Sequence, residues 1–317
     1  MQRISVLDGW RGLSIVLVLM THWLPLRHFG NMGHLTGTAG MALFFCMSGY
    51  LMASILDKGI SLKAFWARRA ARIVPLAWLV ILLCWPIYQF QAQQAFANIL
   101  FVANLPPVQL VHPLKHLWSL CTEMQFYFFI GLAWTLAGRR SLPAIIGLYI
   151  VLVLNKVILH SPTTGSTLQR VDEIFAGFLL YFAIKTDAIK HVRALPWWLW
   201  SAGFLASCLE QAGPFNGFRS FFAAALVGLT VDGFQKADPS IATAFGWLKA
   251  KWLVYMASIS YAVYVLHPVV AETWLGQGDL VGKYLKRPLL LLVVIALAHL
   301  STKFFEPVAT RWARRVR

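Results

Sequence analysis

The chain has 317 residues, of which 59% are hydrophobic and only 13% are charged, and its formal net charge is +16. A soluble globular domain has about 45–50% apolar and about 25% charged residues, so this composition excludes an ordinary soluble protein. The apolar residues form many long runs, which predicts an all-α, polytopic membrane protein rather than one buried core.

Ten runs are apolar enough to be predicted as membrane-spanning helices, since a span needs roughly 20 mostly apolar residues. The sixth and seventh are the weakest, because polar residues intrude at their ends. No soluble domain, low-complexity tract or clear repeat interrupts the runs, so we predict one membrane domain over residues 1–317. The ten runs cover about 10–27, 37–56, 73–90, 116–137, 142–159, 171–186, 195–211, 217–234, 252–274 and 287–306.

The Lys and Arg residues alternate between dense and sparse loops along the chain. Basic loops lie on the cytoplasmic side of a membrane protein, so we predict an integral plasma-membrane protein with both termini in the cytoplasm. Anionic membrane lipids account for most of the positive charge, and we expect no nucleic-acid partner. The N-terminal segment resembles a signal peptide but lacks a small-x-small cleavage site, so we predict that it is retained as the first span.

The four cysteines are scattered singly, without a C-x-x-C pair. We therefore expect packing residues, with no disulfide framework and no metal site. They are Cys46, Cys84, Cys121 and Cys208.

Titratable side chains inside the spans are few, and such residues usually face the interior of a helix bundle. His22 lies in the outer half of the first span, eleven residues after Arg11. Eleven residues are almost three helical turns, so the two side chains share one face, about 16 Å apart. That arrangement suits a long anionic ligand with a reactive end. The alternative is a histidine that only hydrogen-bonds a neighbouring helix, as we expect for His299.

Other polar groups fall near the outer ends of their spans. Glu123 lies about 10 Å into the fourth span, where it could orient His22 as a carboxylate orients a general base. Its alternative role is a structural hydrogen bond to a nearby Trp or Ser. His267 falls in the same outer layer, and Arg170 and Glu173 lie near the outer start of the sixth span. Convergence of polar groups from separate helices is typical of a binding site.

Two further segments have a defined pattern. Arg69 and Arg72 are i,i+3 neighbours before the third span, and guanidinium groups bind phosphate in a bidentate manner. The pair is a candidate ligand site, with a lipid-headgroup anchor as the alternative. The segment from Gly40 to Gly49 is rich in small residues, which permit close helix packing. We expect a packing seam there and assign no chemistry to it.

Taken together and in order, several segments resemble the acyltransferase-3 family of integral membrane acyltransferases, which includes bacterial polysaccharide O-acetylases. Departures from the family pattern are small: Trp10 stands where an aliphatic residue is frequent, and Cys46 interrupts the Phe-Phe segment. The resembling segments are Leu7-Asp8-Gly9-Trp10-Arg11-Gly12 with His22, Phe44-Phe45-Cys46-Met47-Ser48-Gly49-Tyr50, Arg69-x-x-Arg72-Ile73-Val74-Pro75, His116-Leu117-Trp118-Ser119-Leu120-Cys121-Thr122-Glu123-Met124-Gln125-Phe126-Tyr127, and more weakly Arg170…Glu173…Gly177, Ile259-Ser260-Tyr261…His267-Pro268 and Phe305-Glu306-Pro307.

The resemblance implies a ten-span fold in the bacterial inner membrane. It also implies an O-acyltransferase that moves an acyl group, commonly acetyl, from cytoplasmic acyl-CoA to a hydroxyl of a sugar or glycan at the outer face. Some family members carry a C-terminal SGNH esterase-like domain, and we expect none within this chain. The residues that the resemblance makes most important are Arg11, His22, Arg69, Arg72 and the segment from Trp118 to Glu123.

The predicted mechanism places the acyl-CoA phosphates on Arg69, Arg72 and Arg11. The pantetheine arm then carries the thioester toward His22. His22 acts either as the general base on the acceptor hydroxyl or as a covalent acyl carrier, and Glu123 orients it. The acceptor side is predicted to be lined by Trp118, Arg170, Glu173 and His267.

The rival interpretation is a proton-coupled transporter or flippase of a glycan or lipid-linked intermediate, with His22, Glu123 and His267 as a proton relay. A proton path needs no cytoplasmic arginine pair, whereas a CoA site does. The sequence also lacks the discontinuous, glycine-broken spans that transporters carry at corresponding positions of their two halves, which argues against a transporter. A third reading is a catalytically inactive lipid-binding scaffold. The sequence leaves the acceptor, the acyl length and the oligomeric state open.

Overall fold

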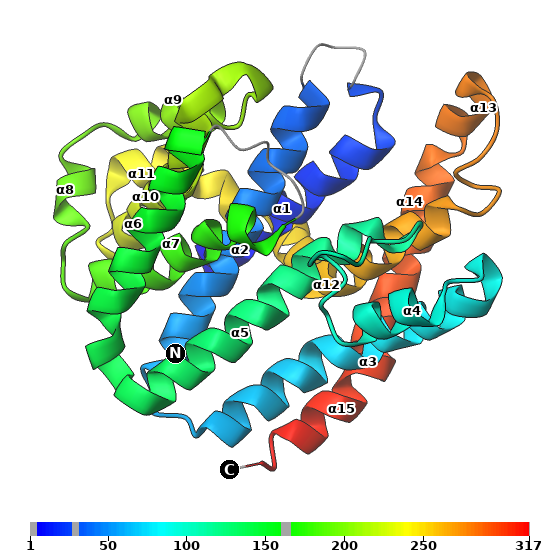
Figure 1. The fold of residues 1–317 in the computed structure, drawn as a ribbon. Helices are drawn as coiled ribbons and strands as arrows, with labels where there is room; N and C mark the ends of the chain where they lie inside the picture. The colour runs from blue at the N-terminus through cyan, green and yellow to red at the C-terminus, as the bar shows by residue number, and fades with distance from the viewer. Residues whose placement is uncertain (1–4, 27–31, 160–165, 317) are drawn as a thin grey trace. The chain divides into compact units, whose positions relative to one another are not determined.

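The computed structural model describes residues 5–26, 32–159 and 166–316 (Figure 1). Every regular element within these ranges is a helix and none is a strand, which confirms the predicted all-α class. Within the same ranges six helical segments are long and apolar enough to cross a membrane, so the number of ten spans stays a prediction. The six segments are Met32–Leu56, Leu62–Tyr88, Leu114–Ile158, Glu210–Gln235, Lys251–Ala271 and Arg287–Ala313.

The two weakest predicted spans both form helices, and each departs from an ideal span for a clear reason. The sixth run forms α7 (Thr167–Lys185), which carries Arg170, Asp172 and Glu173 in its N-terminal part. The seventh run forms α9 (Trp197–Ser207), whose length is 11 residues. A helix of that length rises about 16 Å, which is about half of the hydrocarbon thickness of a bilayer.

The described chain divides into two compact units built from interleaved segments. Unit 1 consists of Met1–Asp57, Arg139–Thr164 and Leu168–Ser258. Its central helix is α2, which is apolar and buried around its whole circumference, as expected for a helix surrounded by others. Besides α7 and α9, unit 1 contains α1 (Ser5–Trp23), α2 (Met32–Leu56), η3 (Gly138–Ser141), α6 (Leu142–Leu159), α8 (Lys190–Arg193), η4 (Glu210–Phe218), α10 (Arg219–Gln235), α11 (Pro239–Phe245), η5 (Gly246–Lys249) and the start of α12 (Lys251–Ala271).

The small residues of α2 form the packing seam that the sequence predicts. A Cβ atom added to Gly49 would lie 1.9 Å from the carbonyl oxygen of Ile174 in α7, and one added to Gly177 would lie 1.9 Å from the carbonyl oxygen of Cys46 in α2. The two backbones are therefore in direct contact at reciprocal glycines. This contact fixes the position of α7, which carries Arg170 and Glu173.

We expect Gly177→Ala to destabilise the protein by about 1–3 kcal/mol, because the added methyl group forces α2 and α7 apart. The control is Gly147→Ala in α6, where an added Cβ meets no atom within 4 Å. That change should be neutral or stabilise by up to about 1 kcal/mol through helix propensity. Thermal unfolding of detergent-purified protein measures both, and equal melting temperatures would contradict the seam.

At one end of unit 1, Asp57 connects the end of α2, the short helix η3 and the end of α7. Its carboxylate accepts hydrogen bonds from the Arg139 Nε atom at 2.9 Å, from the Tyr181 hydroxyl at 3.0 Å and from Lys185. Burial by itself raises the pKa of Asp57, but the bonds from Lys185, Arg139 and Tyr181 outweigh it and hold the pKa below its ordinary value. The contact therefore stabilises the folded protein at neutral pH and is lost as pH falls through that lowered pKa.

Unit 2 consists of Lys58–Gly138, Gly165–Thr167 and Ile259–Arg317. Its longest helix, α3, begins at Leu62 and is capped by Ser61, whose side chain accepts a hydrogen bond from the Ala64 N–H. α3 packs against α4, α5 and α15. The helices of unit 2 are α3 (Leu62–Tyr88), α4 (Ala92–Ile99), η2 (Leu114–Leu117), α5 (Trp118–Ala137), the remainder of α12, α13 (Leu280–Leu285), α14 (Arg287–Leu300), the π-helical η6 (Ser301–Phe305) and α15 (Glu306–Ala313).

Candidate active site

Helix α1 of unit 1 carries the first two predicted site residues. The helix is continuous from residue 5 to residue 23, so Arg11 and His22 do lie on one stripe, about 16 Å apart along the axis. His22 occupies the last helical turn and is exposed, whereas Arg11 is partly buried. The indole of Trp10, the departure from the family pattern, is buried and donates a hydrogen bond to Thr230 at 2.8 Å.

Two glycines fix the rotation of α1 about its axis. A Cβ atom added to Gly9 would lie 2.0 Å from the carbonyl oxygen of Leu248, and one added to Gly12 would lie 2.1 Å from the carbonyl oxygen of Leu253. The face of α1 that carries the two glycines therefore packs directly against the main chain at Leu248 and Leu253. This contact also sets the direction in which the Arg11 side chain leaves the helix. The motif around Arg11 thus has a packing role that spacing alone does not reveal.

In unit 2, α3 holds Arg69 and Arg72 one turn apart, as predicted. The Arg72 Nη1 atom lies 2.8 Å from the Glu306 Oε2 atom, and its guanidinium lies 5.8 Å from the centre of the Tyr261 ring. The Arg69 Nε atom is buried. Sequence reasoning gave Glu306 and Tyr261 no role, although both fall within the segments that carry the family resemblance.

Glu123 and Trp118 both belong to α5 of unit 2. Trp118 is the first residue of α5 and is partly buried. Glu123 is buried and accepts a hydrogen bond from the hydroxyl of Tyr127, one turn later in the same helix. Because Glu123 belongs to unit 2 and His22 to unit 1, the predicted contact between them stays a prediction.

His267 lies against the short helix η2, which directly precedes the helix that carries Glu123. Its ring is fully buried, 5.5 Å from the ring of His116, and its Nδ1 atom lies 2.8 Å from the Tyr264 carbonyl oxygen. A carbonyl oxygen only accepts, so Nδ1 carries the proton. The Ser119 hydroxyl donates to the Tyr264 hydroxyl at 2.6 Å, and Tyr264 in turn donates to the main chain of His116. This chain of hydrogen bonds fixes the Tyr264 side chain against the main chain of η2, and the His116 ring nitrogens contact the carbonyl oxygens of Pro113 and Val265.

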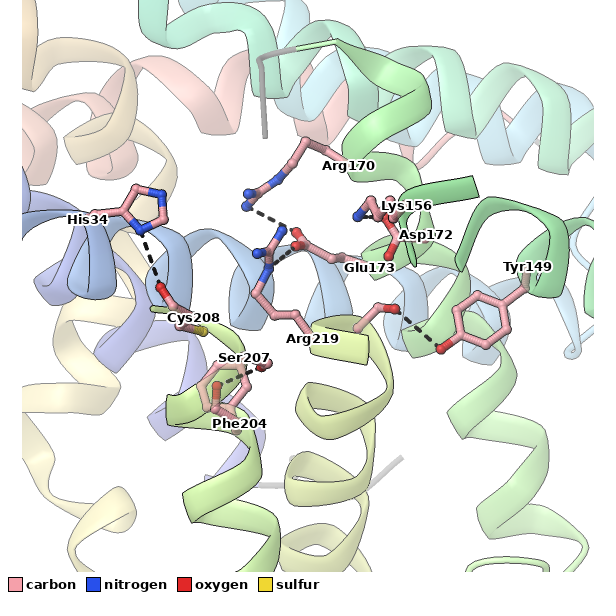
Figure 2. A network of polar contacts seen from close by, with 11 residues as sticks. His34, Tyr149, Lys156, Arg170, Asp172, Glu173, Phe204, Ser207, Cys208 and Arg219 are labelled. Atoms are coloured by element: carbon pink, nitrogen blue, oxygen red, sulfur yellow. Dashed lines mark hydrogen bonds and ion pairs between the residues drawn. The ribbon is translucent and has the colours of Figure 1, made fainter. Parts of the chain in front are cut away.

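A network of buried charges joins α6, α7 and α10 in unit 1 (Figure 2). The Glu173 carboxylate bridges two guanidinium groups: Arg219 Nε lies 2.8 Å from Oε1, and Arg170 Nη2 lies 3.2 Å from Oε2. Lys156 pairs with Asp172 beside them. All five side chains are more than nine-tenths buried. The structure therefore brings the predicted residues Arg170 and Glu173 together, deep inside the unit.

Sequence reasoning missed Arg219 and gave Lys156 no partner. Arg219 is the first residue of α10 and lies 46 positions from Glu173. Nothing in the local pattern around Arg219 indicates that it is buried, because a basic residue at a helix end is usually exposed to solvent. The one available signal is physical: a buried carboxylate inside an apolar helix requires a cation nearby.

Comparison with known proteins gives a match over nearly the whole chain. The family model described as an acyltransferase domain, Acyl_transf_3, matches residues 4–301. The peptidoglycan O-acetyltransferase OatA of Listeria monocytogenes is 29% identical over 59% of this chain and 35% of its own length. The O-acetyltransferase OatA of Staphylococcus aureus is 26% identical over 95% of this chain and 56% of its own length. The chain thus spans about half the length of these curated relatives or less, and no solved structure gives a significant match.

Proposed function

The chain belongs to the Acyl_transf_3 family of acyltransferase domains, and from that premise we propose that it moves an acetyl group from cytoplasmic acetyl-CoA to a hydroxyl of a glycan at the outer side of the membrane. The relatives' names point to a carbohydrate of the peptidoglycan class as the acceptor. The observation that carries the proposal is α1, where Arg11 and an exposed His22 share one stripe of a continuous helix.

In the proposed reaction the donor binds from the cytoplasm, on the side where both termini lie. Arg69, Arg72 and Arg11 hold its phosphate groups, and the extended pantetheine arm spans the distance of about 16 Å from Arg11 to His22. Guanidinium groups suit this role because they remain charged and bind phosphate through two parallel N–H bonds.

The acyl transfer itself needs one proton acceptor. The acceptor hydroxyl oxygen attacks the thioester carbonyl carbon, the carbon–sulfur bond breaks, and the hydroxyl proton passes to His22 and then to the CoA thiolate. In the covalent alternative, a His22 ring nitrogen takes the acyl group first and the hydroxyl attacks the acyl-imidazole. The products in both cases are the acyl ester and free CoA.

The remaining predicted residues complete the proposal. Glu123 orients His22 and stabilises its positive charge during the reaction. Trp118, Arg170, Glu173 and His267 line the acceptor side.

The first test is whether the protein binds CoA. We expect CoA at 100 times its Kd to stabilise detergent-purified protein by about 2.7 kcal/mol, seen as a rise in melting temperature. ATP should give a much smaller rise, because it lacks the pantetheine arm. The rise should disappear in the Arg69→Ala/Arg72→Ala double variant. A wild-type protein that neither responds to CoA nor transfers label from acetyl-CoA in membranes would contradict the proposal.

A further inference from the structure

In the ion pair between Arg72 and Glu306, further hydrogen bonds hold the Glu306 carboxylate in place. Glu306 is the first residue of α15, directly after the π-helical segment η6. Its Oε2 atom accepts the Arg72 bond at 2.8 Å, while its Oε1 atom accepts the Thr302 hydroxyl at 3.0 Å. Single π-helical turns are frequent at functional sites. The irregular turn places Thr302 and Glu306 so that the carboxylate cannot rotate freely.

Tyr261 of α12 holds the same arginine from a second direction. Its ring lies 5.8 Å from the Arg72 guanidinium, within the range of a cation–π contact. Its hydroxyl donates to the carbonyl oxygen of Ile73, the residue after Arg72 in α3. The aromatic ring is therefore anchored to the helix that carries the arginine.

The exposure of the pair is strongly asymmetric. The Glu306 side chain is 4% exposed, whereas the Arg72 side chain is 36% exposed. Among the described residues, the hydrogen bond from Nη1 to Glu306 is the one that Arg72 makes, and a guanidinium has five N–H donors. The exposed N–H donors of Arg72 therefore remain available to an anion that approaches from the solvent, while Glu306 holds the Nη1 atom.

We infer that Glu306 and Tyr261 are positioning residues, which hold the Arg72 guanidinium in the orientation that binds a phosphate group of acyl-CoA. The inference rests on the proposed function and deepens it, because it assigns residues of α12 and α15 to the donor site. An arginine side chain loses much rotational freedom when it binds a ligand. Positioning it in advance removes that cost from the binding of the donor.

A buried carboxylate next to an anion site also repels the anion, so two effects of Glu306 oppose each other. The repulsion is weakened because the exposed part of Arg72 is in contact with solvent, where charges are well screened. Orientation is not screened, because it depends on hydrogen-bond geometry. We therefore expect the loss of orientation to dominate when Glu306 is replaced.

The experiment measures the Kd of CoA for purified protein in detergent by equilibrium binding, together with the melting temperature without CoA. We expect Glu306→Ala to raise the Kd about 10-fold and Glu306→Gln to raise it about 3-fold, since the amide oxygen still accepts a bond from Arg72. The matched control is Thr310→Val on the same helix. The Thr310 hydroxyl bonds the main-chain oxygen of Glu306 rather than its carboxylate, so the Kd should stay unchanged.

A variant with the two charges exchanged distinguishes the orientation of Arg72 by Glu306 from a purely structural contact between α3 and α15. Arg72→Glu/Glu306→Arg restores an ion pair between α3 and α15 but removes the guanidinium from the phosphate position. We expect it to recover most of the melting temperature lost in Glu306→Ala without recovering CoA affinity.

Two results would overturn the inference. One is a Glu306→Ala protein that melts earlier but binds CoA as the wild type does; the other is a swapped variant that regains full CoA affinity. If Glu306→Ala does not fold, Glu306→Gln carries the binding measurement, and an unchanged Kd in that variant counts equally against the inference. A wild-type protein that does not bind CoA at all would instead refute the proposed function.

Discussion

His22→Ala should reduce acetyl transfer by at least about 100-fold, the usual effect of removing a general base or a nucleophile. The side chain is exposed at the end of α1, so its loss leaves no cavity and the melting temperature should change little. The measurement is transfer of label from acetyl-CoA in membranes that contain equal amounts of each variant. His191→Ala, an exposed histidine of α8, is the matched control and should retain full activity. Undiminished transfer by His22→Ala would refute the assignment.

A second measurement on the same protein separates the two roles of His22. If His22 carries the acyl group, protein incubated with labelled acetyl-CoA without acceptor should retain label, which hydroxylamine then removes. If His22 is a general base, the protein should remain unlabelled. The label should be missing from His22→Ala in either case.

The features that sequence alone predicted correctly are local ones. The stripe shared by Arg11 and His22 follows from 3.6 residues per turn within one helix, and the structure contains that helix. The all-α class follows from the long apolar runs. The seam at Gly49 follows from small residues in an apolar segment, because glycine weakens a helix and close helix packing is the usual reason for it there.

The features that sequence could not supply are contacts between distant segments. Glu306 lies 234 positions from Arg72, and Arg219 lies 46 positions from Glu173. In their local sequence, Glu306 and Arg219 are charged residues at helix ends, and such residues usually face water. Their partners become visible only when helices pack, because helix periodicity gives the face of a residue but not the neighbour of that face.

Glu173→Gln should be the most destabilising single change in unit 1, by about 3–5 kcal/mol, because it leaves buried cations without their carboxylate. The Glu173 carboxylate bridges Arg170 and Arg219, so its neutralisation affects two guanidinium groups at once. Arg219→Met should cost less, since Arg170 still pairs with Glu173 and the methionine fills most of the space. The order of the two variants thus tests whether the carboxylate is the centre of the network.

The control for this comparison is Asp187→Asn. Asp187 also contacts two basic residues, Arg193 and Lys236, at 3.0 Å each, but its side chain is 59% exposed. Exposed ion pairs contribute about 0–1 kcal/mol, so the melting temperature should hardly move. A loss in Glu173→Gln no larger than that in Asp187→Asn would show that the buried network does not stabilise the helices it joins. In that case the packing of α7, including its glycine contact with α2, would hold Arg170 and Glu173 in place, and their burial would have to serve the acceptor site.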